Sequence, residues 1–189
     1  MIRFSDPKHC PWWTILATVA AAIVVLRLEG QPWFCECNQL RVLIGDAYSS
    51  HTSQHLLDPY SLTHVQHGLV LFFLVGSLAH DWRWPWQLWL AIAIEAAWEI
   101  FENTPFVIDR YRTTTAALGY NGDSVLNSVG DILACTLGVL VARRLGWRKT
   151  CALFFTIELV LLVTIRDSLL LNVVMLLVPN EALIEWQQG

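Results

Sequence analysis

The chain has 189 residues, of which 55% are hydrophobic and only 15% are charged, and its mean hydropathy is +0.47. Soluble domains usually carry about 25% charged residues, so this composition argues against a water-soluble enzyme and favours a single integral membrane domain over residues 1–189. The formal net charge is −4 and no basic tract is present, so nucleic acid is not an expected partner.

Five apolar stretches are long enough, or nearly so, to cross a bilayer at about 20 residues per crossing. They cover residues 12–28, 64–80, 85–104, 124–142 and 150–165. A sixth stretch, 168–178, is short, so a half-span, an interfacial helix and a tilted crossing all stay open. The sequence therefore predicts an all-α, polytopic transmembrane helical bundle of five spans plus a short sixth apolar helix or half-span. The first stretch lacks a small-residue cleavage site and is expected to be a retained anchor.

Basic residues near the span ends set the expected orientation, because cytoplasmic segments are enriched in lysine and arginine. The residues on the more basic side are Arg3, Lys8, Arg83, Arg143, Arg144, Arg148 and Lys149. We therefore expect a multi-pass plasma (inner) membrane protein, surrounded by the lipid bilayer, with a cytoplasmic N-terminus. A long outer loop, residues 29–63, then leads into the second span.

Polar residues recur at the outer ends of three of the predicted spans. They are His64 and His67 in the second span, Glu95, Glu99 and Glu102 in the third, and Asp123, Asn127 and Asp131 at the start of the fourth. The spacing within each set places its members on one face of a helix. Because an ionised carboxylate inside a bilayer costs several kcal/mol, these groups are expected to face the bundle interior and to have partners.

Carboxylate and imidazole side chains from facing helices are the ligands of metal sites in helical bundles. For a divalent zinc, manganese or iron ion, the expected ligands are His64, His67, Glu99 and Asp131. Glu95 or Glu102 is the expected general base, acting on water bound to the metal. Two alternatives stay open: a metal-free network of ion pairs with nearby arginines, and a path for protons or ions.

The remaining polar residues at this end are assigned to a structural network or to substrate binding. The network residues are Asn103, Asp123, Asn127, Arg166 and Asp167. Arg110 and Arg112 suit an anionic head group, because guanidinium groups bind carboxylate and phosphate in a bidentate manner. They equally suit ion pairs with the carboxylates.

The outer loop carries a second set of chemically active side chains. Cys35 and Cys37 form a C-E-C pair, for which a small-ring disulfide and thiolate ligation of a metal both stay open. His51 and His55 are interpreted mainly as loop residues, with a lid over the site as the alternative. Ser61 lies three residues before His64, which is a weak indication of a serine nucleophile.

The chain resembles a family of small bacterial inner-membrane proteins known only as a domain of unknown function. The stretches that carry this resemblance are C-E-C (35–37), S-Q-H-L-L-D-P-Y-S-L-T-H-V-Q-H-G (53–68), W-E-I-F-E-N (98–103), Y-N-G-D-S-V-L-N-S-V-G-D (120–131) and I-R-D-S-L-L-L-N-V-V-M (165–175). The resemblance implies a place in the plasma membrane and no particular activity. Residues 127–138 also look distantly like VanZ-type membrane proteins.

Two functions are consistent with these observations. The first is a metal-dependent hydrolase or transferase that acts on a lipid or envelope substrate at the outer face. The second is a non-catalytic accessory or assembly subunit whose polar network fixes helix register among membrane-protein partner subunits. Gly68, Gly76, Gly130 and Gly138 would allow close helix packing in either case.

Overall fold

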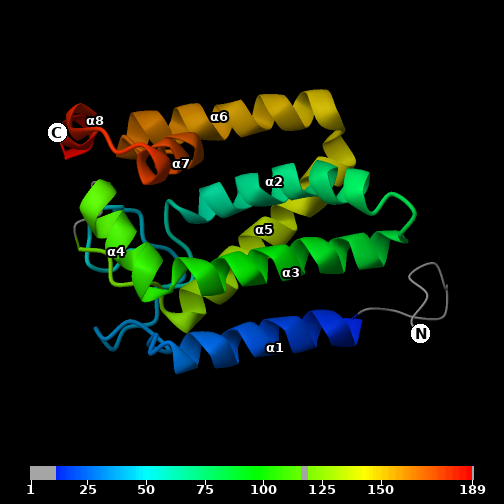
Figure 1. Ribbon diagram of the computed structural model, residues 1–189, viewed down its shortest axis with the longest axis horizontal. Helices are drawn as coiled ribbons and strands as arrows, with labels where there is room; N and C mark the ends of the chain where they lie inside the picture. The colour runs from blue at the N-terminus through cyan, green and yellow to red at the C-terminus, as the bar shows by residue number, and fades with distance from the viewer. Residues whose placement is uncertain (1–11, 116–118, 189) are drawn as a thin grey trace.

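A computed structural model of the chain describes residues 12–115 and 119–188 and shows an all-helical fold (Figure 1). Within these residues the helices are α1 (Trp12–Leu28), α2 (Ser61–Leu78), α3 (Trp84–Glu102), α4 (Pro105–Thr114), α5 (Val125–Leu145), α6 (Trp147–Ile165), α7 (Leu169–Leu177) and α8 (Glu181–Gln188). The same residues contain no β-strand, only an isolated bridge between Leu43 and Leu57. The prediction of an all-α fold is confirmed.

The five long helices form a bundle whose two ends differ in structure (Figure 1). The loop 29–60 and the short helices α4, α7 and α8 gather at one end of the bundle. The turns between α2 and α3 and between α5 and α6 lie at the other end. The ends of α2, α3 and α5 that carry the predicted polar residues therefore meet beneath the loop and the short helices.

Close contact between α2 and α5 holds the centre of the bundle together. A side-chain carbon added at Gly68 would overlap the carbonyl oxygen of Cys135, and one added at Gly138 would overlap that of Val65. Gly130 lies equally close to the carbonyl of Leu56 in the loop, whereas Gly76 has open space around it. Three of the four predicted small-residue positions thus allow the backbones to approach closely.

Apolar side chains fill two neighbouring clusters around this central pair. The first lies among α1, α2, α3 and α5, and the second lies between α2, α5 and α6. One buried polar contact links α2 to α6, because the side-chain amide of Gln66 donates to the carboxylate of Glu158 at 2.7 Å. That hydrogen bond satisfies the amide nitrogen and one carboxylate oxygen within an otherwise apolar contact.

Helices occur at all six predicted apolar stretches, whereas α4 and α8 were not predicted, and the expected five spans are not all borne out. Among the described residues only α2 and α5 are long and apolar enough to cross a membrane, and a third span results if α6 and α7, bent by 75°, count as one. Helix α1 is shorter, at 17 residues. Helix α3 is continuous, but its otherwise apolar sequence contains three glutamates. Arg3 and Lys8, used for the predicted orientation, lie outside the described residues.

Candidate functional site

The start of α2 is positioned by Asp58, which precedes the helix in the segment Asp58-Pro59-Tyr60. Its carboxylate accepts hydrogen bonds from the backbone amides of Ser53, Tyr60 and Ser61, at 2.7, 2.8 and 3.2 Å. Two of these amides belong to the first turn region, whose donors lack intrahelical partners. Asp58 therefore fixes the position from which His64 and His67 enter the bundle.

The predicted His and Glu residues lie together in the interior. Nδ1 of His64 lies 2.7 Å from Oε1 of Glu95 and 3.2 Å from Oε1 of Glu99. Nδ1 of His67 lies 3.1 Å from both carboxylate oxygens of Glu95. His64 is 7% exposed, and Glu95 and Glu99 are at most 1% exposed, so bulk water does not solvate these charges.

Glu99 is incompletely satisfied by the surrounding protein. Neither of its carboxylate oxygens has a hydrogen-bond partner, although Oε1 lies within ion-pair distance of His64. Oε2 of Glu102, one turn further along α3, also lacks a partner. Buried carboxylate oxygens without donors are costly, so this arrangement calls for a cation or a proton between them.

Asp131 reaches the same group of residues from α5. Its Oδ2 atom lies 3.9 Å from Nε2 of His64, and its Oδ1 atom accepts a hydrogen bond from Ser61 Oγ at 2.7 Å. The hydroxyl of Ser61 is thus directed to a carboxylate and not to His64, which disfavours its use as a nucleophile activated by that histidine. His64 lies between carboxylates from α3 and α5.

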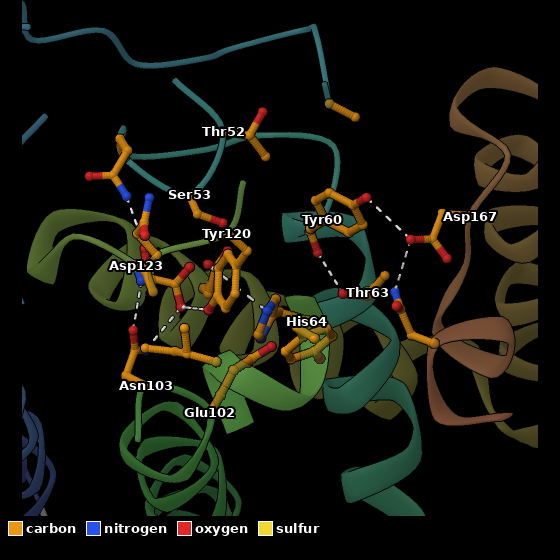
Figure 2. Close-up of a pocket in the computed structure, with 18 of the residues that line it drawn as sticks. Thr52, Ser53, Tyr60, Thr63, His64, Glu102, Asn103, Tyr120, Asp123 and Asp167 are labelled. Atoms are coloured by element: carbon orange, nitrogen blue, oxygen red, sulfur yellow. Dashed lines mark hydrogen bonds and ion pairs between the residues drawn. The ribbon is translucent and has the colours of Figure 1, made fainter. Parts of the chain in front are cut away.

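Asn103 and Asp123 form a hydrogen-bonded network at the rim of the site (Figure 2). The side chain of Asn103 donates to Asp123 at 2.9 Å and accepts from the Asp123 amide at 2.6 Å. The hydroxyl of Tyr120 also donates to Asp123, at 3.1 Å. Burial raises the pKa of Asp123 despite these donors. Asn127 lies on the neighbouring turn, where its amide donates to the carbonyl of His55.

A cavity of about 1600 Å³ opens above these residues. Its polar lining includes His64, His67, Glu95, Glu102 and Asp131, and its apolar lining includes Leu71, Ile94, Leu169, Val173 and Leu176. Figure 2 shows His64 and Glu102 directed into this space, with Thr52 and Ser53 of the loop on its far side. The cavity thus combines a charged floor with apolar walls.

The predicted arginines are held by backbone carbonyls. Arg110 donates to the carbonyl of Leu176 at 2.9 and 2.6 Å, and Arg112 donates to the carbonyl of Tyr120 at 2.5 Å and to the side chain of Asn121. Arg112 lines the cavity, whereas Arg110 ties α4 to the end of α7. These hydrogen bonds, and not the alternative ion pairs with carboxylates, hold the two side chains.

Arg166 and Asp167, expected to belong to one polar network, point in different directions. Arg166 is exposed, has a left-handed backbone with φ 51°, and donates to the carbonyl of Trp186. Asp167 is buried and accepts hydrogen bonds from Tyr60 and Asn172, both at 3.2 Å (Figure 2). Asp167 therefore joins the loop to α7 on the side of the cavity away from Asp123.

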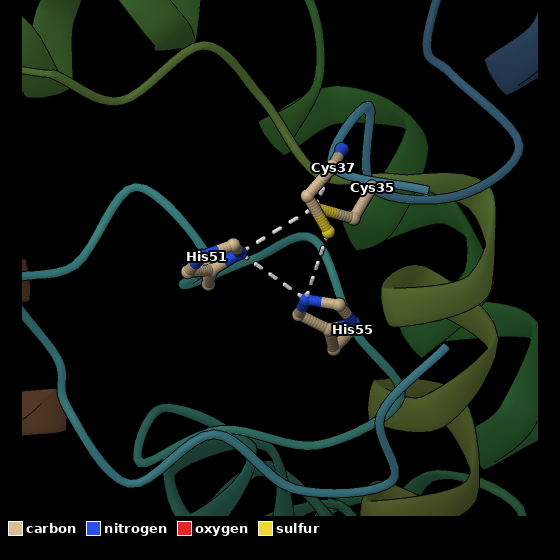
Figure 3. A group of neighbouring side chains, drawn as sticks. All are labelled: Cys35, Cys37, His51 and His55. Carbon is tan, nitrogen blue, oxygen red and sulfur yellow. Dashed lines mark hydrogen bonds between the residues drawn. The ribbon is translucent and has the colours of Figure 1, made fainter. Parts of the chain in front are cut away.

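A second cluster of side chains with metal-binding chemistry lies in the loop (Figure 3). It consists of Cys35, Cys37, His51 and His55, whose ligand atoms all lie within 4.8 Å of one another. The sequence predicts thiolate ligation as one role of the cysteines, but the histidines are expected there mainly as separate loop residues. The signal that was available is the combination of C-x-C with H-x-x-x-H, which lie on two arms of one loop.

Two further groups of the described residues have ligand atoms close enough for one ion, and they share His64. The first is His64, His67 and Glu95, and the second is His64, Glu99 and Glu102. Both histidines and all three glutamates of the predicted site are thus brought together. Glu95, predicted as a general base, is the carboxylate that contacts both imidazoles.

Residues 26–189 match the protein family described as "Protein of unknown function (DUF2585)". The chain is 44% identical to a UPF0314 protein of Sphingopyxis alaskensis over 94% of this chain and 95% of that one. It is 44% identical to UPF0314 protein R03235 of Rhizobium meliloti, over 92% and 88% of the two chains. No solved structure gives a significant match. The likeness of residues 127–138 to VanZ-type proteins is not shown by these matches.

Proposed function

Because the chain belongs to the DUF2585 family, whose function is unknown, we propose its function from the site itself. The protein is a membrane enzyme that uses a divalent metal ion to hydrolyse, or transfer a group from, a lipid-like substrate. The observation that carries this proposal is the convergence of His64, Glu95 and Glu99, of which His64 and Glu95 line a large cavity and Glu99 lies buried behind them with both oxygens lacking hydrogen-bond donors.

The residues present suit a cation better than a closed network of hydrogen bonds. In such a network, each buried carboxylate oxygen would receive a donor, as Asp123 does from Asn103. Glu99 and Glu102 instead direct unpartnered oxygens toward the same interior region as His64. Imidazole and carboxylate ligands favour zinc, manganese or iron.

We assign the metal to the Nδ1 side of His64, with Glu99 as the second ligand and Glu95 and Glu102 beside them. Asp131, expected from the sequence as a ligand, faces the opposite ring nitrogen of His64, and His67 groups with Glu95, so neither belongs to this ligand set. A metal ion held by these residues would supply a water of lowered pKa as a nucleophile at neutral pH. Glu102 lies at the cavity edge of this set and is the residue we expect to remove the proton from that water. Glu95, which contacts both imidazoles, orients the histidines.

The cavity determines the expected substrate class. Its volume of about 1600 Å³ exceeds the roughly 300–1,000 Å³ of typical small-molecule pockets. Apolar residues of α2, α3 and α7 line one part of it, while Arg112 and Tyr120 line another. This division suits an amphiphile with an anionic head group near Arg112 and acyl chains against the apolar walls.

We place the protein in the inner membrane with the cavity at the outer face. The basic residues Arg143, Arg144, Arg148 and Lys149 lie around the turn from α5 to α6, at the opposite end of the bundle from the cavity (Figure 1). The positive-inside rule assigns that end to the cytoplasm. The substrate would then be a lipid or a lipid-linked envelope component.

The metal is tested first by elemental analysis of the purified full chain. We expect metal in the wild type and its loss from this site in Glu99→Gln, which keeps the shape of the side chain but removes its charge. Glu158→Gln is the matched control, because Glu158 is also buried but lies between α2 and α6. Equal metal in Glu99→Gln and the wild type would contradict the assignment of Glu99.

The activity is tested with vesicles of phosphatidylglycerol and phosphatidylethanolamine that contain the protein, followed by mass spectrometry of the lipids. Products should appear with zinc, manganese or iron and should decline by at least about 100-fold in Glu102→Gln, if this residue acts as a general base. Wild-type protein that contains no metal and gives no product would favour the accessory-subunit function instead.

A further inference from the structure

The loop cluster of Cys35, Cys37, His51 and His55 has the geometry of a second, separate metal site. Sγ of Cys35 lies 3.5 Å from Nδ1 of His51, and Sγ of Cys37 lies 3.8 Å from Nε2 of His55. The two histidine nitrogens are 3.4 Å apart. In Figure 3 the four side chains point toward a common centre from two separate arms of the loop.

These separations match the edges of a tetrahedron around zinc. With zinc about 2.3 Å from sulfur and about 2.0–2.1 Å from nitrogen, tetrahedral geometry separates two nitrogens by about 3.3 Å and a nitrogen from a sulfur by about 3.6 Å. The observed values of 3.4, 3.5 and 3.8 Å lie within about 0.2 Å of these distances. Cys35 and Cys37 are free thiols, and neither is joined in a disulfide.

The surrounding backbone supports thiolate ligands in this position. The amide of Cys37 donates a hydrogen bond to Sγ of Cys35 at 3.3 Å, which stabilises a negatively charged sulfur. Asn38 closes the turn with φ 58° and donates its amide to the carbonyl of Cys35. On the other arm, Asn127 of α5 donates to the carbonyl of His55 at 2.9 Å. The histidine arm is thus fixed to the bundle.

One contact must change when a metal binds. The amide of Arg41 donates to Nδ1 of His55 at 3.3 Å, so in the metal-free protein the proton of this ring is on Nε2. Coordination through Nε2 moves that proton to Nδ1 and breaks the contact with Arg41. The two thiol protons are released to solvent in the same event.

We propose that Cys35, Cys37, His51 and His55 bind one zinc ion that fixes the outer loop over the cavity. Residues 29–60 contain no helix or strand and expose large apolar side chains, including Trp33, Phe34 and Leu43. A loop with so little regular structure needs another source of order, and a four-ligand zinc site supplies it by joining residues 35–37 to residues 51–55. Because Cys35, Cys37 and His51 also line the cavity, the ion sets the position of the cavity wall.

The site is tested by titrating Co²⁺ into the metal-free, reduced full chain in detergent. Tetrahedral cobalt bound to thiolates gives a sulfur-to-cobalt charge-transfer absorption, which the proposed ligands of the His64 site cannot produce because none of them contains sulfur. We expect one equivalent of this signal in the wild type and its displacement by one equivalent of Zn²⁺. X-ray absorption of the zinc form should show two sulfur ligands at about 2.3 Å.

Matched variants separate this site from the first. Cys37→Ser should lose at least half of the charge-transfer signal, because only Cys35 can still supply a thiolate, and zinc affinity should fall by more than the roughly 10–100-fold caused by loss of a residue that only hydrogen-bonds a ligand. Cys151→Ser, which alters an exposed cysteine on α6, and His64→Ala should both retain it. His51→Cys should retain the ion with stronger thiolate absorption, which shows that a changed ligand set still folds. A Cys35–Cys37 disulfide in the purified chain, or a cobalt spectrum without thiolate absorption, would refute the proposal.

Discussion

His64 is the residue on which the largest number of site contacts depends. One ring nitrogen faces Glu95 and Glu99 of α3, and the other faces Asp131 of α5. The ring therefore separates three carboxylates that would otherwise repel one another in the low dielectric of the interior. Its entry point is set by Asp58, so a loop residue determines where charge is placed in the bundle.

Asp123 gives a pH-dependent prediction at the same scale. Burial raises its pKa above the ordinary value of about 3.9, so the folded form holds a proton more tightly than the unfolded form. The stabilising contribution of Asp123 is complete at pH values below its ordinary pKa in the unfolded chain. It is lost as the pH rises through the raised pKa of the folded protein. Asp123→Asn should remove this decline, because the amide has no charge to bury.

The measurement is the thermal midpoint of the wild type and Asp123→Asn from pH 4 upward. The midpoint of the wild type relative to the variant should fall as the pH increases. Asp109→Asn is the control, because Asp109 is exposed and should show no such relative change. A pH-independent difference between the wild type and Asp123→Asn would contradict the prediction.

The predicted site residues differ in how far sequence alone could place them. Spacings of i, i+4 and i+7 put Glu95, Glu99 and Glu102 on one face, and the structure brings that face to His64. Helix periodicity says nothing about irregular segments, however. The meeting of Cys35 with His51 depends on the path of the loop, and the contact of Arg110 with the carbonyl of Leu176 depends on how the short helices α4 and α7 pack together.

At the scale of helices, apolar stretches predicted α1, α2, α3, α5, α6 and α7, because a long run of Leu, Val, Ile and Ala is compatible with little else in a bilayer. The short helices α4 and α8 lie outside those stretches and were not predicted. The predicted stretches and the observed helices agree to within a few residues. The apolar stretches predicted the number of membrane crossings less well than they predicted the helices. It requires a length and apolarity that α1 and α3 do not reach, and the 75° bend between α6 and α7 arises at the polar residues 166–168.

Helix packing predicts that the small residues on α2 and α5 are not interchangeable. Gly138→Ala places a methyl group against the carbonyl of Val65, so the helices must separate. Overpacking of this kind costs roughly 1–3 kcal/mol, which exceeds the gain in helix propensity of at most about 1 kcal/mol. In a chain of this length the thermal midpoint should fall by several degrees.

Gly76→Ala provides the matched control, because this glycine lies on α2 with nothing within 4 Å of the added carbon. It should be neutral or slightly stabilising in the same thermal assay. Equal destabilisation by Gly138→Ala and Gly76→Ala would mean that the close contact between α2 and α5 does not determine stability.

The whole molecule is polarised along the bundle axis. One end carries the cavity, the loop with Cys35 and His55, and the acidic residues of α3 and α5. The other end carries Arg83 and a cluster of four basic residues around the turn from α5 to α6, whereas five arginines are spread over the cavity end: Arg27, Arg41, Arg110, Arg112 and Arg166. Both proposed metal sites therefore lie at the same end of the bundle.

This polarity predicts the orientation of the protein in the inner membrane. Single cysteines introduced as Asp109→Cys on α4 and Asp81→Cys in the turn between α2 and α3 mark the two ends, and both positions are exposed. A membrane-impermeant thiol reagent applied to intact spheroplasts should label the peptide that contains residue 109. The peptide that contains residue 81 should react only after permeabilisation, because the basic end faces the cytoplasm. Labelling of residue 81 alone in intact spheroplasts would place the cavity on the cytoplasmic side and exclude envelope substrates at the outer face.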